Sequence, residues 1–389
     1  MKEIQPIDQQ NRIQSLDVMR GFSLLGIFIV NMIAFHSPIY YYNPYSWWGN
    51  TVDRPVYWWI DVFVQASFYP LFTILFGFGL ALQYGRSIEK GTTFYPFALK
   101  RLGVLLFIGT IHAFIIWSGD ILISYAVVGF LLLLLLQLEG KLLLVIGLLL
   151  FLLPQVLISA IFIVASIADP TSVTYFNAVQ EIQSSIEAYG NGTISDIFSQ
   201  RLSDWLYANN PASFLSLAIA LLPLMMIGAG VSKMKLIEKA ADKKKSLILI
   251  ILLTLPAALV LKTSPYWMEK NLAYSFIQDF VGGPLLAVSY MALLALLMTR
   301  KKAAKWLRPL AQTGRMSLTN YLMQSIAGTL IFYSYGLGLY GEISLLTGFY
   351  IAIGLFAIQV ILSDLWLSKF SQGPVEFVWR RLTYGKNVK

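Results

Sequence analysis

The chain has 389 residues, of which 57% are hydrophobic and 13% charged, and its formal net charge is +9 at pH 7. A soluble domain of this length would interrupt its apolar segments with charged faces, whereas apolar stretches of about twenty residues recur here. Because about 18 apolar residues cross the roughly 30 Å hydrocarbon core of a bilayer, the composition excludes an ordinary soluble protein. It predicts an all-α, polytopic transmembrane bundle.

We expect ten membrane-spanning helices in a single membrane domain, residues 1–389. The predicted spans are residues 16–35, 58–84, 99–117, 121–138, 142–168, 212–231, 246–261, 273–298, 316–335 and 345–367. An N-terminal half of five spans (16–168) carries the candidate site, and a C-terminal half of five spans follows at 212–389.

The distribution of basic residues predicts the topology. With a cytoplasmic N-terminus, only Arg54, Arg201, Lys262 and Lys270 of the 29 lysines and arginines fall on the outer side. This asymmetry is typical of an even number of spans with both termini inside. The basic runs "KKK" and "RKKAAK" are therefore topology signals, and we expect no nucleic-acid partner.

Two polar segments lie outside the predicted spans. The external segment 169–211 has helical spacing, with Tyr175, Val179 and Ile182 on one side, and predicts an interfacial helix or a cap. The tail "GPVEFVWRRLTYG" predicts a short amphipathic helix whose Arg380 and Arg381 face anionic lipid.

The first span contains three polar residues that are expensive inside a membrane: Asp17, Arg20 and Asn31. Asp17 and Arg20 are one turn apart and can pair, either functionally or as an ion pair at the headgroups. Arg20 and Asn31 share a helix face within about 20° and lie about 16 Å apart along the axis. Asn31 would serve either a site or a hydrogen bond between helices.

The stretch "GTIHAFIIWSGDILISYA" places His112, Trp117 and Asp120 close together. Asp120 opens the fourth span and can cap its N-terminus, but a carboxylate there can also orient a nearby imidazole and raise its basicity. The second histidine, His36, ends the first span. A buried histidine can equally be a structural, hydrogen-bonded residue.

Further polar and small residues favour contacts between helices. Asn320 and Gln324 share a helix face, where they join helices or line a pocket; we favour the first interpretation. Glycine pairs in "LFGFGLA" and "MIGAGVS" indicate close helix packing. The absence of cysteine excludes disulfides and thiolate chemistry, and two histidines without an acidic cluster predict no metal site.

Several motifs together resemble the bacterial YeiB-like membrane proteins, whose C-terminal half is the domain of unknown function 418. They are "RIQSLDVMRGFSLLGIFIVNM", "LFTILFGFG", "HAFIIWSGDIL", "GRMSLTNYLMQS" and "GPVEFVWRRLTYG". The resemblance runs nearly end to end and implies a multi-pass protein of the bacterial plasma membrane. More distantly, the family is similar to transmembrane acyltransferases, including the lysosomal heparan glucosaminide acetyltransferase.

This resemblance implies acyl transfer from cytosolic acetyl-CoA, or another acyl-CoA, to a small-molecule or glycan acceptor on the outer side. Asn31 corresponds to an asparagine of the lysosomal enzyme, and His36, at a shorter spacing, to its histidine. His112, steered by Asp120, would act as general base and Asn31 would stabilise the oxyanion. Arg20 with its partner Asp17, and Arg86, Lys100 and Arg101, would hold the CoA, while Trp117, Asn320 and Gln324 would line the pocket.

Two other functions are compatible with the sequence. A transporter or a lipid or small-molecule binding protein would also use intramembrane polar residues, although no internal repeat is evident. A sensor or assembly partner would bind its ligand through the segment 169–211. Membrane lipids and a homodimer are the remaining expected partners.

Overall fold

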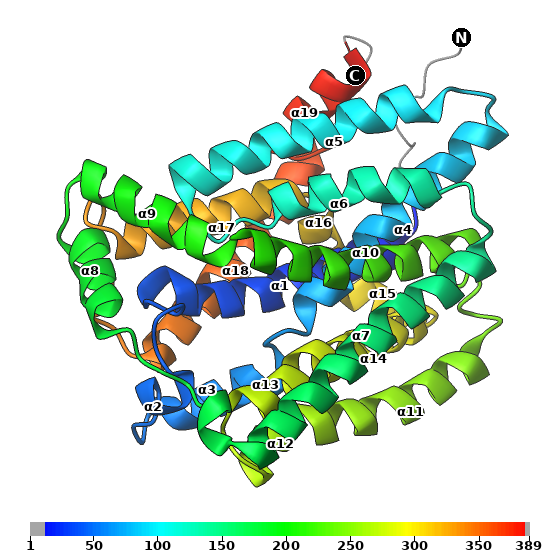
Figure 1. Cartoon of the computed structure of the whole chain (residues 1–389). Helices are drawn as coiled ribbons and strands as arrows, with labels where there is room; N and C mark the ends of the chain where they lie inside the picture. The colour runs from blue at the N-terminus through cyan, green and yellow to red at the C-terminus, as the bar shows by residue number, and fades with distance from the viewer. Residues whose placement is uncertain (1–11, 386–389) are drawn as a thin grey trace.

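The computed structural model describes residues 12–385, and this part of the chain is helical without any strand (Figure 1). The predicted all-α, polytopic membrane class is confirmed. Each of the ten predicted spans coincides with helix, and eight helical segments are long and apolar enough to cross a membrane by themselves. The exact number of crossings and the sides of the termini remain predictions.

The eight long segments are α1 (Gln14–His36), α3 and α4 (Asp53–Phe63 and Phe68–Glu89), α5 with the π-helix η2 (Phe94–Ile111 and His112–Ile116), α7 (Gly140–Ala168), α10 (Pro211–Lys233), α11 (Lys244–Lys262), α13 with the π-helix η4 and α14 (Leu272–Ile277, Gln278–Gly282 and Gly283–Met298), and α18 (Leu345–Lys369). The other two predicted spans are shorter helices, α6 (Leu122–Leu135) with 14 residues and α17 (Ser317–Phe332) with 16.

Shorter helices complete the described chain. They are α2 (Pro44–Trp47), η3 (Pro170–Val173), α8 (Val179–Gly190), α9 (Ile194–Ala208), α12 (Ser264–Trp267), α15 (Lys301–Trp306), α16 (Arg308–Arg315) and α19 (Pro374–Tyr384). The second predicted span is interrupted between α3 and α4, where Ala66 has a φ of 54°. A positive φ of this size is a conformation that residues with a Cβ adopt only rarely.

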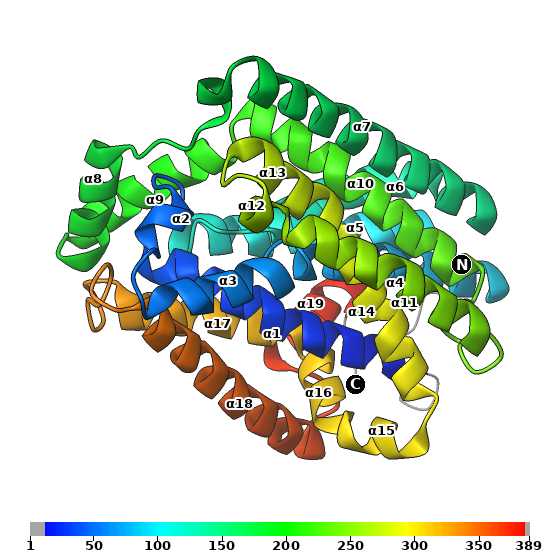
Figure 2. The ribbon, with the colours of Figure 1, turned by 90° about the horizontal axis from the view of Figure 1, so that it is seen from below.

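Helix α1 lies inside the bundle, with α7 and α18 on opposite edges (Figure 2). It packs against α4 and α14 and also against α16, α17 and α18, so the two halves of the chain are interleaved. In its most apolar window 61% of residues are buried, compared with 11% in α11. A helix that is apolar on all sides and little buried by protein is stable only in an apolar solvent. We therefore infer that α11 faces lipid, whereas α1 is surrounded mainly by other helices.

Helices α4 and α10 approach closely at glycines, as the glycine pairs predicted. Gly77 lies against the carbonyl oxygen of Met225, and Gly228 lies against that of Ile74. A Cβ at either glycine would overlap the opposing backbone. Small residues let helix backbones approach until van der Waals packing holds them together, which is the main association force within lipid.

The external segment forms a hairpin of α8 and α9 at one end of the bundle (Figure 1). Ile182 is buried as predicted, but Val179, the first residue of α8, is 59% exposed. Ser334 donates backbone and side-chain hydrogen bonds to Tyr189 and Gly192, and these tie the hairpin to the end of α17. We call α8 and α9 the cap.

We expect Gly77→Ala to destabilise the protein by about 1–3 kcal/mol, because the new methyl group must push α10 away from α4. The matched control is Gly85→Ala on the same helix, where a Cβ meets no atom within 4 Å. Thermal unfolding in detergent measures both. Equal melting points for the two variants would contradict the close packing.

Candidate functional site

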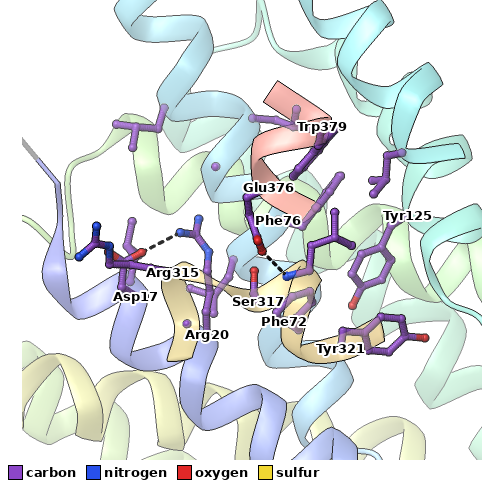
Figure 3. A pocket seen from close by; sticks show the side chains of 18 of the residues that line it. Asp17, Arg20, Phe72, Phe76, Tyr125, Arg315, Ser317, Tyr321, Glu376 and Trp379 are labelled. Atoms are coloured by element: carbon purple, nitrogen blue, oxygen red, sulfur yellow. Dashed lines mark hydrogen bonds and ion pairs between the residues drawn. The ribbon is translucent and has the colours of Figure 1, made fainter. Parts of the chain in front are cut away.

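A cavity of about 220 Å³ lies between α1, α4, α17 and α19, with further walls from α5 and α6. We call it the basic cavity, because six arginines line it: Arg12, Arg20, Arg86, Arg101, Arg315 and Arg380. Asp17 and Glu376 are the acidic residues among its described lining. Figure 3 shows Arg20 and Arg315 at one end of the cavity and Tyr125 and Tyr321 at the other.

At the end of the basic cavity where the arginines gather, two of them share the carboxylate of Asp17. Asp17 accepts hydrogen bonds from Arg12 at 3.1 Å and from Arg20 at 3.2 Å, so the predicted pairing of Asp17 with Arg20 is confirmed. Burial lowers the pKa of Arg315 and of Arg380, and the neighbouring Arg12 guanidinium lowers both further. Burial first, and repulsion by Arg12 second, therefore disfavour the cationic forms of these two arginines.

Helix α19 closes one side of the basic cavity. The Glu376 carboxylate accepts hydrogen bonds from the backbone N–H groups of Leu318 and Thr319, at 2.7 and 3.1 Å, and caps the N-terminus of α17 (Figure 3). Trp379 donates to the carbonyl of Arg101 at 3.0 Å, and the Arg101 guanidinium lies 3.7 Å above its ring. Helix caps and cation–π contacts of this kind hold the amphipathic tail against the bundle.

The predicted amphipathic helix therefore forms, but its predicted orientation is wrong for one residue. Arg380 lines the basic cavity instead of facing lipid, whereas Arg381 is exposed. The hydrophobic pattern of the tail indicated a helix with one apolar face. It did not indicate that α5 and α17 would pack against this helix and leave Arg380 in the cavity.

The second part of the site is a buried hydrogen-bonded chain around His112. Its Nδ1 lies 2.8 Å from Oδ1 of Asp120, and its Nε2 lies 2.8 Å from the hydroxyl of Ser325. The side chains of His112 and Asp120 are completely buried. Asp120 Oδ2 also accepts the backbone N–H of Ile123 at 2.8 Å. The carboxylate thus accepts a backbone N–H of the first turn of α6, where Ile121 holds the N-cap position, and is hydrogen-bonded to the imidazole.

The local backbone presents His112 to its partners. The chain widens into the π-helix η2 at His112–Ile116 and then turns at Trp117, which lets Asp120 return to the same level. π-helices are uncommon and frequent at functional sites. Arg201 of the cap donates to the carbonyls of Phe114 and Ile115, at 3.2 and 2.6 Å, and satisfies backbone groups at the end of η2.

His112 lies between two cavities. Tyr321, whose ring is 5.0 Å from the imidazole, lines the basic cavity; Trp117, at 6.3 Å, lines a small pocket of about 10 Å³ under the cap. We call this pocket the cap cavity. It has room for about one water molecule. The two cavities share no lining residue, so the histidine is part of the partition between them.

The cap cavity contains a second buried carboxylate. Asp204 accepts hydrogen bonds from the hydroxyls of Tyr41 and Tyr189, both at 2.7 Å, and from Gln200 at 2.8 Å. Burial raises the pKa of Asp204, although these three hydrogen bonds act in the opposite direction. Aromatic rings surround this carboxylate, since Tyr40, Tyr41, Trp117, Tyr189, Tyr333 and Tyr340 line the cavity.

Of the residues predicted to bind a cofactor, Asp17, Arg20, Arg86 and Arg101 line the basic cavity, and Lys100 is exposed outside it. Trp117 lines the cap cavity, as described above. Sequence reasoning missed the other cavity residues that carry chemistry. These are Arg12, Arg315, Tyr321 and Glu376. The sequence offered Ser325 as a polar residue of the ninth predicted span, and its four-residue spacing from Tyr321 indicated only that the two share a helix face.

The remaining predicted residues lie elsewhere. Asn31 is half-buried and lines neither cavity, while His36 is buried, stacks on Trp48 at 5.6 Å and binds the carbonyl of Ile33. Asn320 and Gln324 line neither cavity. They donate to Ser363 and Gln359 of α18, each at 3.0 Å, so they join helices as the favoured interpretation stated.

These features define a multi-pass helical membrane protein with a buried polar relay between two cavities. The model of a protein family described as "Protein of unknown function (DUF418)" matches residues 231–386. Uncharacterized protein YxaH of Bacillus subtilis is 33% identical over 403 residues, covering 99% of this chain and 97% of the relative. The chain belongs to this family of YeiB-like membrane proteins.

Two further relatives match over nearly their whole lengths. Uncharacterized protein YeiB of Escherichia coli is 28% identical over 395 residues, covering 95% of each chain. An uncharacterized 39.9 kDa protein in the amylase 3' region of Bacillus acidopullulyticus is 27% identical over 403 residues, covering 98% of this chain and 96% of the relative. The similarity therefore extends over nearly the whole chain.

We expect Glu376→Ala to destabilise the protein by about 1–3 kcal/mol, because the N–H groups of Leu318 and Thr319 lose their acceptor. Thermal unfolding and the rate of tryptic cleavage at Arg380 and Arg381 measure the effect. The control is Glu342→Ala, which changes an exposed glutamate. Unchanged tryptic cleavage in Glu376→Ala would contradict the docking of α19 through this carboxylate.

Burial also raises the pKa of Glu376 above its usual value of 4.5, against the effect of its hydrogen bonds. The folded protein then binds more protons than the unfolded chain between 4.5 and the raised value. Stability from this group is fully present below 4.5 and is lost as the pH rises through the raised pKa. Unfolding temperatures of the wild type and Glu376→Gln, compared between about pH 4 and about pH 7, should diverge in that direction. Parallel curves would contradict this pKa shift.

Proposed function

We propose that the protein is a transmembrane acyltransferase that moves an acyl group from an acyl-CoA in the basic cavity to an acceptor under the cap. The observation that carries this proposal is the position of His112. Its imidazole is hydrogen-bonded to Asp120 and lies between Tyr321 of the basic cavity and Trp117 of the cap cavity. A general base at a partition can serve a donor on one side and an acceptor on the other.

The basic cavity suits a phosphorylated donor with an apolar arm. Guanidinium groups bind phosphate oxygens through paired hydrogen bonds, and here several of them gather around the carboxylate of Asp17. Beyond them the wall becomes apolar and aromatic, through Leu24 and Phe76 to Tyr321. From Asp17 to Ile27, the lining residues of α1 extend over about 15 Å. The donor's acyl end would then face the partition.

Asp120 supports the chemistry by keeping the proton of His112 on Nδ1, so that Nε2 is the basic atom. The carboxylate also stabilises the imidazolium that forms when Nε2 takes a proton. Asn31 and His36 enter no step of this proposal, because no hydrogen bond among the described residues joins either of them to His112. Asp204 and the tyrosines of the cap cavity would bind the acceptor's polar groups.

The proposed orientation follows from the charge. The arginine end would face the cytosol, where acyl-CoA is present, and the cap would face the outer side of a bacterial plasma membrane. The lysines 243–245, at the start of α11, would lie on the same cytosolic side. Family membership supports a bacterial setting, since the relatives are proteins of Bacillus and Escherichia coli.

A transporter is the second candidate function, supported by an ion pair of a buried lysine away from both cavities. Lys262 is completely buried and donates to Asp279 at 3.2 Å and to the carbonyl of Gln65 at 2.9 Å. Ionisable residues within membrane helices commonly mark ion or proton pathways. A transporter would need neither CoA nor the basicity of His112.

The first test is thermal unfolding of the purified protein with acetyl-CoA, with desulfo-CoA and with buffer alone. A ligand that binds only the folded state raises the melting point. We expect both CoA compounds to do so, and we expect Arg20→Gln to weaken desulfo-CoA binding about tenfold by removing one charged hydrogen bond. Lys100→Gln is the control, because Lys100 is exposed outside the cavity. The absence of any shift at saturating acyl-CoA would exclude the acyltransferase and favour the transporter.

A further inference from the structure

The hydroxyl of Ser325 has a defined role in the hydrogen-bonded chain. Asp120 accepts the N–H of Ile123 on Oδ2 and faces Nδ1 of His112 with Oδ1, so the proton between Asp120 and His112 lies on Nδ1. Nε2 is then an acceptor, and its hydrogen-bond partner among residues 12–385 is the Ser325 hydroxyl, 2.8 Å away. The alternative acceptor for this hydroxyl, the carbonyl of Tyr321, is farther away at 3.4 Å.

This arrangement is that of an activated nucleophile: a hydroxyl donates to an imidazole whose other nitrogen is oriented by a carboxylate. The three side chains come from α17, η2 and the turn before α6, and all three are buried. An acceptor that used His112 directly would first have to displace Ser325 from Nε2. Ser325 itself needs no displacement, because it already occupies the position from which a proton is abstracted.

Ser325 also lies on the side of α17 that faces the basic cavity. Ser317 and Tyr321 line that cavity, and Ser325 follows Tyr321 by the same interval of four residues. Ser325 is about 12 Å from Ser317 along the helix axis. At the far end of the same helix, Tyr333 lines the cap cavity. The serine therefore lies along α17 between the two cavities, next to Tyr321, the lining residue past which the donor's acyl end would reach it.

We propose that Ser325 is the nucleophile and carries the acyl group as an ester between two half-reactions. This inference rests on the proposed acyltransferase function and adds a covalent intermediate that the function itself does not require. A covalent carrier would account for the separation of the two cavities, because donor and acceptor need never occupy one site together.

In the first half-reaction the Ser325 oxygen bonds to the thioester carbon and the carbon–sulfur bond breaks. The hydroxyl proton passes to Nε2 of His112 and then to the leaving thiolate, which departs as free CoA. In the second, an acceptor hydroxyl or amine bonds to the ester carbon and the bond to Ser325 breaks. The acceptor's proton passes through Nε2 back to the serine oxygen, so the protein is regenerated and no oxidant or reductant is needed.

The test is isotope exchange without any acceptor. Purified full-length protein is incubated with acetyl-CoA and isotopically labelled free CoA, and label in acetyl-CoA is measured over time. An acyl-serine intermediate makes the first half-reaction reversible, so label must enter acetyl-CoA. We expect Ser325→Ala to reduce this exchange at least about 1000-fold, as the loss of a nucleophile does. It should leave the thermal shift by desulfo-CoA unchanged, because Ser325 does not line the basic cavity.

Two further variants separate chemistry from folding. Ser325→Cys should accumulate the acetyl group as a thioester, detected by mass spectrometry on the peptide that contains residue 325 and released by hydroxylamine. Ser23→Ala is the matched control, because Ser23 is an equally buried serine that donates to its own helix at Met19. This variant should exchange label at the wild-type rate.

Each outcome is decisive. A desulfo-CoA shift without exchange or acetylation would overturn the covalent intermediate and leave direct transfer as the mechanism. Exchange that persists in Ser325→Ala would overturn the assignment of the nucleophile. The absence of a shift with acetyl-CoA and desulfo-CoA would overturn the proposed function and this inference with it.

Discussion

The arrangement of this protein depends on one requirement: each of the two nitrogens of the buried His112 imidazole needs a hydrogen-bond partner. Inside a membrane bundle each unsatisfied polar group costs about 1–3 kcal/mol or more, and no bulk water can substitute for a missing partner. His112 meets this requirement through Asp120 on one side and Ser325 on the other. The two hydrogen bonds hold the α5–α6 turn against α17, and the cavities lie on either side of that contact.

The second organising feature is the concentration of positive charge in the basic cavity. Asp17 neutralises part of it, and Glu376 is engaged in capping α17, so the guanidinium groups of Arg315 and Arg380 remain poorly compensated. Burial and repulsion from Arg12 both disfavour these charges. Because α19 contributes both a cap for α17 and a wall of the cavity, the lining of the cavity depends on docking of the C-terminal helix.

Relations between neighbours in the sequence could be predicted. Asp17 and Arg20 are one helical turn apart. His112 and Asp120 lie on the two sides of one reverse turn between helices. Spacing in the sequence therefore indicated both pairs. The sequence also indicated the helices, because an apolar run long enough to cross a bilayer satisfies its backbone hydrogen bonds by forming a helix. Lys100 and Asn31 were assigned to a site that they do not line. Their helices are apolar on all sides, so the sequence does not indicate which face of each helix points toward the site.

By itself the sequence determined the membrane class, the helical segments and the local polar pairs, because backbone hydrogen bonding and helical periodicity act over a few residues. Only the tertiary structure decided that Ser325 meets His112, 213 residues earlier in the chain, and that Glu376 caps α17 from 57 or 58 residues away. Contacts of this kind depend on how each helix is rotated and shifted against its neighbours. Those degrees of freedom are set by packing across the whole bundle, such as the glycine contacts of α4 with α10, and not by the pattern within one helix.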